Sequence, residues 1–81
     1  MTNNIDKEIG ARIKFHRRAK NISQAQLAKS IGFKSATALH YLESGKRMLG
    51  VSDLLDISRV LGVSVYVLLG HYEWPASDSN L

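Results

Sequence analysis

The sequence lacks cysteine, contains a single proline and has no long run of apolar residues. Without cysteine, neither a disulfide framework nor a thiolate metal site can form. No stretch approaches the roughly eighteen apolar residues that a membrane-spanning helix needs. The first eight residues, MTNNIDKE, contain no apolar run typical of a signal peptide. We therefore expect a soluble, cytoplasmic protein.

Residue groups that would support metal binding or catalysis are also missing. His16, His40 and His71 are each more than four residues from the next histidine, and no cluster of carboxylates accompanies them. Serine, histidine and aspartate are all present, but nothing in a chain of 81 residues places a nucleophile beside a base in a pocket. We expect no metal, no cofactor and no enzymatic activity.

Negative charge is scarce in the first part of the chain. The segment from Lys7 to Arg47 contains ten cations and two carboxylates, a net charge of +8, whereas the segment from Met48 onward contains one cation and four carboxylates, a net charge of −3. Many small proteins carry a modest positive charge on solvated faces, but such a polarised distribution favours a polyanion as partner of the basic part.

Hydrophobic periodicity predicts five short helices and no strand, an all-α fold with 44% hydrophobic residues to form one small core. The first helix is expected at residues 5–20. Phe15 lies about 120° from its apolar stripe, so this ring either packs outside the main core or stays exposed. Asn21 can adopt the left-handed conformation that ends a helix. The stripe itself consists of Ile5, Ile9, Ile13 and His16.

Capping signals set the limits of the next two helices. Ser23 and Gln26 form a capping box, and the helix that follows is expected to end at Gly32. Ser35 is the expected N-cap of the third helix, and Gly45 lies past its end. The inward positions are Leu27, Ala28 and Ile31 in the second helix and Ala38, Leu39 and Leu42 in the third.

The last part of the chain contains two further helices and a tail. Residues 52–61 form the fourth predicted helix, with Leu54, Ile57 and Leu61 inward and Gly62 past its end. The segment SVYVLLG, residues 64–70, would also suit a strand, but a lone strand has no partner for its backbone groups, so we expect a helix. The tail loses periodicity at Pro75, and roughly its last six residues are expected to be disordered.

Several residues stand in an order characteristic of one family: Arg17, Ser23-Gln24, Leu27-Ala28, Gly32, Glu43, Gly45-Lys46 and Leu61-Gly62-Val63. This order resembles the Cro and repressor type of helix-turn-helix domain, also called XRE-like. The resemblance covers roughly Ile9 to Leu69. It implies a compact five-helix bundle with a lambda-repressor-like DNA-binding domain in residues 1–70. Residues 71–81 would form a tail that is partly disordered or contacts a dimer partner.

The same resemblance assigns roles to individual residues. In this family the helix after the turn enters the major groove, where small or hydrogen-bonding side chains suit its first turn. No arginine or glutamine lies on this face, so specificity would depend on apolar contacts, water or DNA shape. Arg17 and Glu43 match a structural ion pair. The expected base contacts are Ser35, Ala36, Thr37, His40 and Tyr41, and the expected phosphate contacts are Gln24, Lys34, Lys46 and Arg47.

One spacing departs from the family pattern. Glu43 follows the turn glycine, Gly32, by eleven positions, whereas the common pattern has ten. Counting back from Glu43 aligns the third helix with the family, so the extra residue lies in the turn at about Lys34. The assigned base contacts therefore transfer within the third helix.

Two functional hypotheses follow. The first is a sequence-specific regulator of double-stranded DNA, a repressor or autoregulator that binds an inverted repeat as a homodimer. Its self-association surface would contain Val65, Tyr66, Leu68, Leu69, Tyr72 and Trp74, although a fifth helix could equally supply ordinary core. The second is a protein-interaction module of the same fold, such as an antitoxin or a regulator of another factor, which would use Phe15, Tyr72 and Trp74.

Overall fold

This computed structural model describes residues 4–70 of the chain. These residues form five α-helices joined by turns, and they contain no strand. They are α1 (Asn4–Ala19), α2 (Gln24–Ser30), α3 (Ala36–Glu43), α4 (Val51–Leu61) and α5 (Val65–Leu69). The all-α prediction is confirmed, and the fifth segment is a helix rather than a strand. The expectations for residues 71–81, including those for Tyr72 and Trp74, lie outside the described residues.

The predicted caps are present at the helix ends. Gln26 donates its backbone N–H to the Ser23 hydroxyl over 3.0 Å, and Ser23 donates its own N–H to the Gln26 side chain over 2.8 Å. The Ser35 hydroxyl accepts from the Ala38 N–H over 3.4 Å. Asn21, two residues after the end of α1, adopts a φ of 58°. These local interactions fix where α2 and α3 begin and thus how the two helices follow each other.

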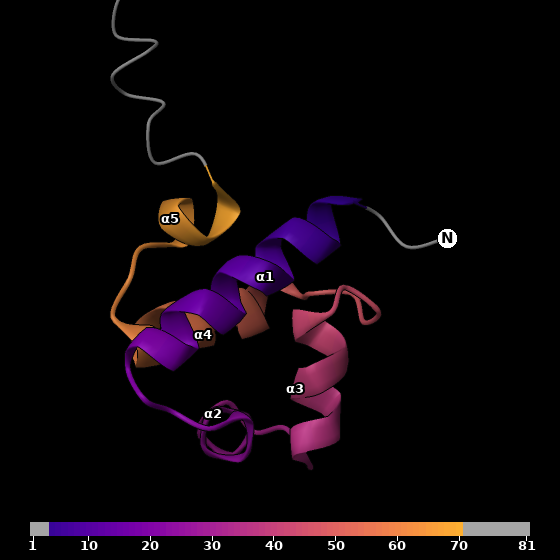
Figure 1. Cartoon of the computed structure of the whole chain (residues 1–81), viewed down its shortest axis with the longest axis vertical. Coiled ribbons are helices and arrows are strands. Elements are labelled where there is room, and N and C mark those ends of the chain that lie inside the picture. The colour runs from indigo at the N-terminus through magenta and orange to yellow at the C-terminus, as the bar shows by residue number, and fades with distance from the viewer. Residues whose placement is uncertain (1–3, 71–81) are drawn as a thin grey trace, which may run out of the picture.

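One hydrophobic core joins the helices. Figure 1 shows α1 crossing the front of the molecule, with α4 behind it, α3 at one side and α5 above it. The core residues are Ile9, Ile13, Leu27, Ala28, Ile31, Leu39, Leu42, Ile57, Leu61 and Leu68. Of the other predicted inward residues, His16, Ala38 and Leu54 are half-buried. None of the helices in residues 4–70 is long and apolar enough to cross a membrane.

Two predictions about apolar residues are wrong. Ile5 was expected on the buried stripe of α1, but it is 59% exposed. Periodicity indicates which side of a helix faces inward but not whether neighbouring elements cover its first turn. Leu68 was expected on a self-association surface, but it is fully buried because α5 packs against both α1 and α4. Of its neighbours, Val65 and Leu69 are half-buried and Tyr66 is exposed.

Two glycines allow α1 and α3 to approach closely. A Cβ at Gly10 would lie 2.5 Å from the carbonyl oxygens of Leu42 and Glu43, so only a residue without a side chain fits there. Gly45, with a φ of 80°, ends α3 in the left-handed conformation and packs against the backbone of Lys7. Backbone packing against α1 therefore determines the position of the C-terminal end of α3.

Candidate nucleic-acid interface

The third helix has two clearly different faces. Leu39 and Leu42 are buried in the core, whereas Thr37, His40 and Tyr41 are exposed. At 3.6 residues per turn, the four expected base contacts inside the helix fall within about 140° of its circumference, opposite the leucines. Ser35 is exposed at the N-cap and Ala36 is half-buried. The structure thus brings together all five expected base contacts on one outward surface.

Two aromatic side chains shape the C-terminal part of this surface. The rings of His40 and Tyr41 lie 5.8 Å apart between centroids, at an interplanar angle of 52°. Tyr41 is 47% exposed, so about half of this residue is accessible to solvent. The first turn, by contrast, presents only the small side chains of Ala36 and Thr37. A DNA base edge can therefore approach the backbone at the start of α3 and meet longer side chains one turn later.

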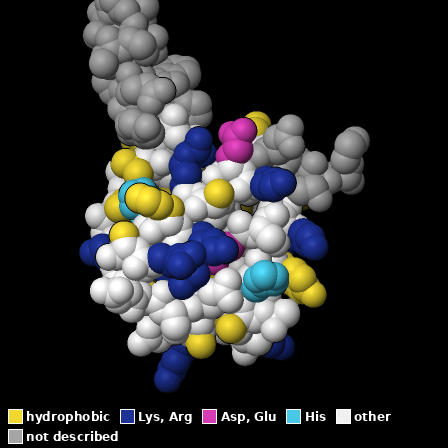
Figure 2. Space-filling model, in the orientation of Figure 1, with side chains coloured by type: hydrophobic (Ala, Val, Ile, Leu, Met, Phe, Trp, Pro, Cys, Tyr) yellow, Lys and Arg dark blue, Asp and Glu magenta, His cyan; other side chains and the backbone are white. Residues whose placement is uncertain are grey.

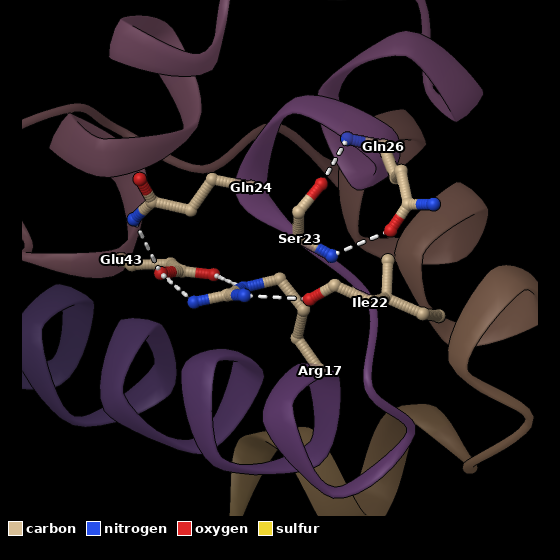
Figure 3. A network of polar contacts seen from close by, with 6 residues as sticks. All are labelled: Arg17, Ile22, Ser23, Gln24, Gln26 and Glu43. Carbon is tan, nitrogen blue, oxygen red and sulfur yellow. Dashed lines mark hydrogen bonds and ion pairs between the residues drawn. The ribbon is translucent and has the colours of Figure 1, made fainter.

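A buried ionic network holds the end of α3 against α1 and α2 (Figure 3). Arg17 donates from Nε to Glu43 Oε2 over 2.6 Å and from a terminal nitrogen to Oε1 over 3.3 Å. It also donates to the carbonyl oxygen of Ile22 over 2.6 Å. Both side chains are less than a tenth exposed. The expected structural pair is thus formed, and it connects α3 to the rest of the fold.

Gln24 belongs to the same network. Its side-chain amide donates to Glu43 Oε1 over 3.0 Å, as Figure 3 shows. An amide group has a second N–H and a carbonyl oxygen, so this bond leaves donor and acceptor capacity for a ligand. Gln24 is the first residue of α2 and is only half-buried. The bond to Glu43 restricts the rotamers of Gln24 at the place where a phosphate contact is expected.

Three cations lie at the two ends of α3. Lys34, Lys46 and Arg47 are all exposed. The guanidinium carbon of Arg47 lies 4.3 Å from the centroid of the Phe33 ring, a cation–π contact that joins the turn before α3 to the loop after it. Sequence reasoning did not identify Phe33 as part of the site. Its only available signal was an aromatic residue in an otherwise polar turn.

Positive charge extends beyond α3. Figure 2 shows Lys and Arg side chains distributed over the face with α1 in front, where Asp and Glu occupy little of the visible area. Within residues 4–70 no group of three or more histidine, aspartate or glutamate side chains is arranged to hold a metal ion. The outward face of α3 and the exposed cations at its two ends present hydrogen-bonding groups, positive charge and small apolar groups, a combination that suits a polyanion.

Residues 13–68 match the model of a protein family described as "Helix-turn-helix". The chain is also similar to the restriction-modification controller protein C.AhdI from Aeromonas hydrophila, at 24% identity and a TM-score of 0.75, covering 82% of this chain and 98% of that one. The clp gene regulator ClgR from Corynebacterium glutamicum is 25% identical, with a TM-score of 0.76 and coverages of 83% and 86%. The hypothetical transcription factor NHTF from Neisseria is 22% identical, with a TM-score of 0.74 and coverages of 85% and 79%. No curated protein matches the chain.

Proposed function

The chain belongs to the helix-turn-helix family, in its Cro and repressor type of DNA-binding transcription regulator, and we propose that it is a repressor or autoregulator that reads a specific DNA sequence through α3. The resemblance seen in the sequence is thereby confirmed. The observation that carries the proposal is the outward face of α3, whose polar, small and aromatic side chains have no role in the core. Of three similar solved structures, one is named as a restriction-modification controller protein, one as a gene regulator and one as a hypothetical transcription factor.

Base recognition would follow from how α3 enters the major groove. Ala36 lets the backbone approach or contacts a thymine methyl group, and Thr37 offers both a hydroxyl and a methyl group. His40 and Tyr41 reach further into the groove or to its edge. Ser35 contributes its backbone groups and its hydroxyl, which still has hydrogen-bonding capacity beyond the bond that it accepts from the Ala38 N–H. Because this set lacks arginine and glutamine, bridging water and DNA shape supply part of the specificity.

Phosphate contacts would orient α3 in the groove. Gln24, which donates a hydrogen bond to Glu43, contacts the DNA backbone near the start of α2. Lys34 in the turn and Lys46 after α3 provide exposed cations. Arg47, held against the Phe33 ring, presents its guanidinium in a restricted position. Such contacts determine register and contribute the salt-dependent part of the affinity.

The protein would act as a homodimer on an inverted repeat. One module of this size buries a modest interface, and two half-sites about one DNA turn apart multiply its affinity. The exposed apolar residues in the C-terminal half of the described chain support this. Val51 and Leu55 are one turn apart on α4, Met48 precedes them, and Tyr66 is exposed on α5. We propose that these four residues contribute to the dimer contact, in place of the buried Leu68.

Selection of bound sequences from a randomised duplex library, at about 150 mM salt to suppress phosphate-only binding, tests this function. Enrichment of an inverted repeat is expected, and its half-site spacing would identify the dimer. If no sequence is enriched while duplex still binds weakly with a steep salt dependence, only the phosphate contacts exist and the operator proposal fails.

The oligomeric state has its own test. Sedimentation at micromolar concentration should give the mass of a dimer, and Leu55→Glu should lower it to that of a monomer because a carboxylate would be buried at the contact. Asp53→Glu, a conservative change on the same helix, is the matched control and should leave the dimer intact. A monomer mass for the unchanged protein would contradict the dimer.

A second function, binding of a protein partner, is favoured by one observation. Phe15 lies on the outer face of α1 and is 67% exposed. The sequence prediction that it packs outside the main core or stays exposed is confirmed. The two functions are compatible, because α1 and the outward face of α3 are different surfaces.

A further inference from the structure

The outer face of α1 carries a shallow, open groove that the DNA-binding proposal does not use. Phe15 lines this groove together with Ala11, Lys14, Arg18 and Ala19. Ala11, Phe15 and Ala19 recur every four residues and so form one stripe along the helix. A single exposed aromatic side chain is ordinary on a protein surface. A ring set in a groove with small residues on either side is a shape that an apolar side chain can enter.

The charge around the groove has one sign. Lys14 and Arg18, the only titratable residues that line it, are both cationic. Neither forms an ion pair with another residue of the described range 4–70. Because they are four residues apart on a helix, they repel each other and destabilise α1. An anionic group bound between them would remove this repulsion, which no group in the described chain does.

The groove is also separate from the recognition helix. Gly10 marks the side of α1 that faces α3, since a Cβ there would meet the backbone of Leu42 and Glu43. Phe15 follows five residues later, which places it about 140° around the helix. Figures 1 and 2 share one orientation, in which α1 crosses the front and Lys and Arg side chains lie over that face. A molecule centred on Phe15 would therefore lie away from the contact between α1 and α3, with Lys14, about 40° around the helix from Gly10, on the side nearer to α3.

We propose that this groove binds a short acidic segment of a partner protein. The segment places an apolar side chain against Phe15 and carboxylates against Lys14 and Arg18. The groove runs from Ala11 to Ala19, about 12 Å along the helix axis, a length that fits two turns of a helix or a short extended peptide. Apolar contact supplies affinity, and charge complementarity selects the acidic partner, as in helix-in-groove recognition.

Panning of phage-displayed random peptides against the full-length protein tests the proposal. Enriched peptides are expected to combine Asp or Glu with Leu, Phe or Trp. Their synthetic versions should bind Phe15→Ser about tenfold more weakly, the loss that follows removal of an aromatic anchor. Arg18→Glu should weaken them similarly. Lys29→Glu, a charge reversal at an exposed position of α2, is the matched control for Arg18→Glu and should not change peptide binding. Thermal unfolding checks the fold of each variant.

Several outcomes would overturn the proposal. The first is a panning experiment that enriches no peptide, and the second is enrichment of peptides without acidic residues. The third is that the synthetic peptides bind Phe15→Ser as tightly as they bind the unchanged protein. Three other occupants are distinguished in the same set of variants. If the chain's own C-terminal segment fills the groove, the Phe15→Ser change will shift the fluorescence emission of Trp74, the single tryptophan, even when no peptide is present. If a second copy fills it, Phe15→Ser will lower the sedimenting mass. If DNA fills it, Arg18→Glu will weaken duplex binding as strongly as Lys46→Ala does. Each of these results rejects an acidic protein partner.

Discussion

Arg17 and Glu43 form a buried ion pair with two hydrogen bonds, although they are 26 positions apart in the chain. The pair connects α1 to the last residue of α3, and Gln24 adds a bond from α2 to the same carboxylate. No buried side-chain nitrogen or oxygen in the described range lacks a partner. A satisfied network of this kind fixes the relative orientation of the three helices more surely than it adds net stability.

Glu43→Ala should therefore destabilise the fold rather than selectively weaken DNA binding. It would leave the Arg17 guanidinium buried without a counter-charge, at a cost of about 3–5 kcal/mol. The free energy of unfolding, measured by urea denaturation, is expected to fall by that amount. Asp56→Ala is the matched control, because it breaks an ion pair with Arg59 that is exposed and should cost less than about 1 kcal/mol. Equal stability of the Glu43→Ala and unchanged proteins would contradict this role.

Gly10→Ala should also destabilise the protein, although alanine has a higher helix propensity than glycine. Alanine is favoured over glycine by about 1 kcal/mol inside a helix. Here the new methyl group would lie 2.5 Å from two carbonyl oxygens of α3. Overpacking should therefore lower the free energy of unfolding by a net amount of roughly 1–3 kcal/mol. Lys14→Ala, on the exposed side of the same helix, should change stability by less than about 0.5 kcal/mol. A higher unfolding midpoint for Gly10→Ala would show that α1 and α3 do not pack this closely.

Lys46→Ala and Gln24→Ala should weaken duplex binding in different ways. Removing a cation that neutralises one phosphate lowers the slope of log K against log[salt] by about 0.9 for each bound protomer. Gln24 is neutral, so its removal should reduce affinity with the slope unchanged. Fluorescence anisotropy titrations at several salt concentrations measure both quantities. An unchanged slope for Lys46→Ala would place this residue outside the interface.

Phe33→Leu should weaken DNA binding through Arg47. Leucine keeps the apolar packing of this half-buried position but removes the ring under the guanidinium. A cation–π contact at such a site contributes about 0.5–1 kcal/mol, so duplex affinity is expected to fall about two- to fivefold. Phe33→Tyr, which retains a ring, should preserve affinity. In an Arg47→Ala background, Phe33→Leu should have no further effect. An additional loss there would mean that Phe33 acts independently of Arg47.

Local chemistry in the sequence predicted much of this fold. Ser23 with Gln26, Ser35 and Asn21 each signal a helix end through interactions with backbone groups a few residues away. Such signals need no knowledge of the tertiary structure. The residues on the outward face of α3 could be predicted equally well, because the periodicity of a helix with known ends determines which residues share a face.

Contacts between distant segments were harder to predict. Leu68 is buried because α5 packs on α1, a helix that ends 49 positions before Leu68 in the chain. The stack of Arg47 on Phe33 depends on how the chain returns after α3. The bond from Gln24 to Glu43 likewise requires α2 and α3 to be placed first. Periodicity identifies an apolar side but not the element that covers it, which is why Ile5 was also placed wrongly.

The outward face of α3 is proposed to read individual bases, and repeated selection with single variants tests this role most directly. Sequences would be selected from one randomised duplex library with the unchanged protein, with Thr37→Ala and with Tyr41→Ala. We predict that each variant relaxes the preference at one position of each half-site and leaves the other positions unchanged. An identical consensus from all three proteins would contradict the claim, because the specificity would then arise from residues other than these two.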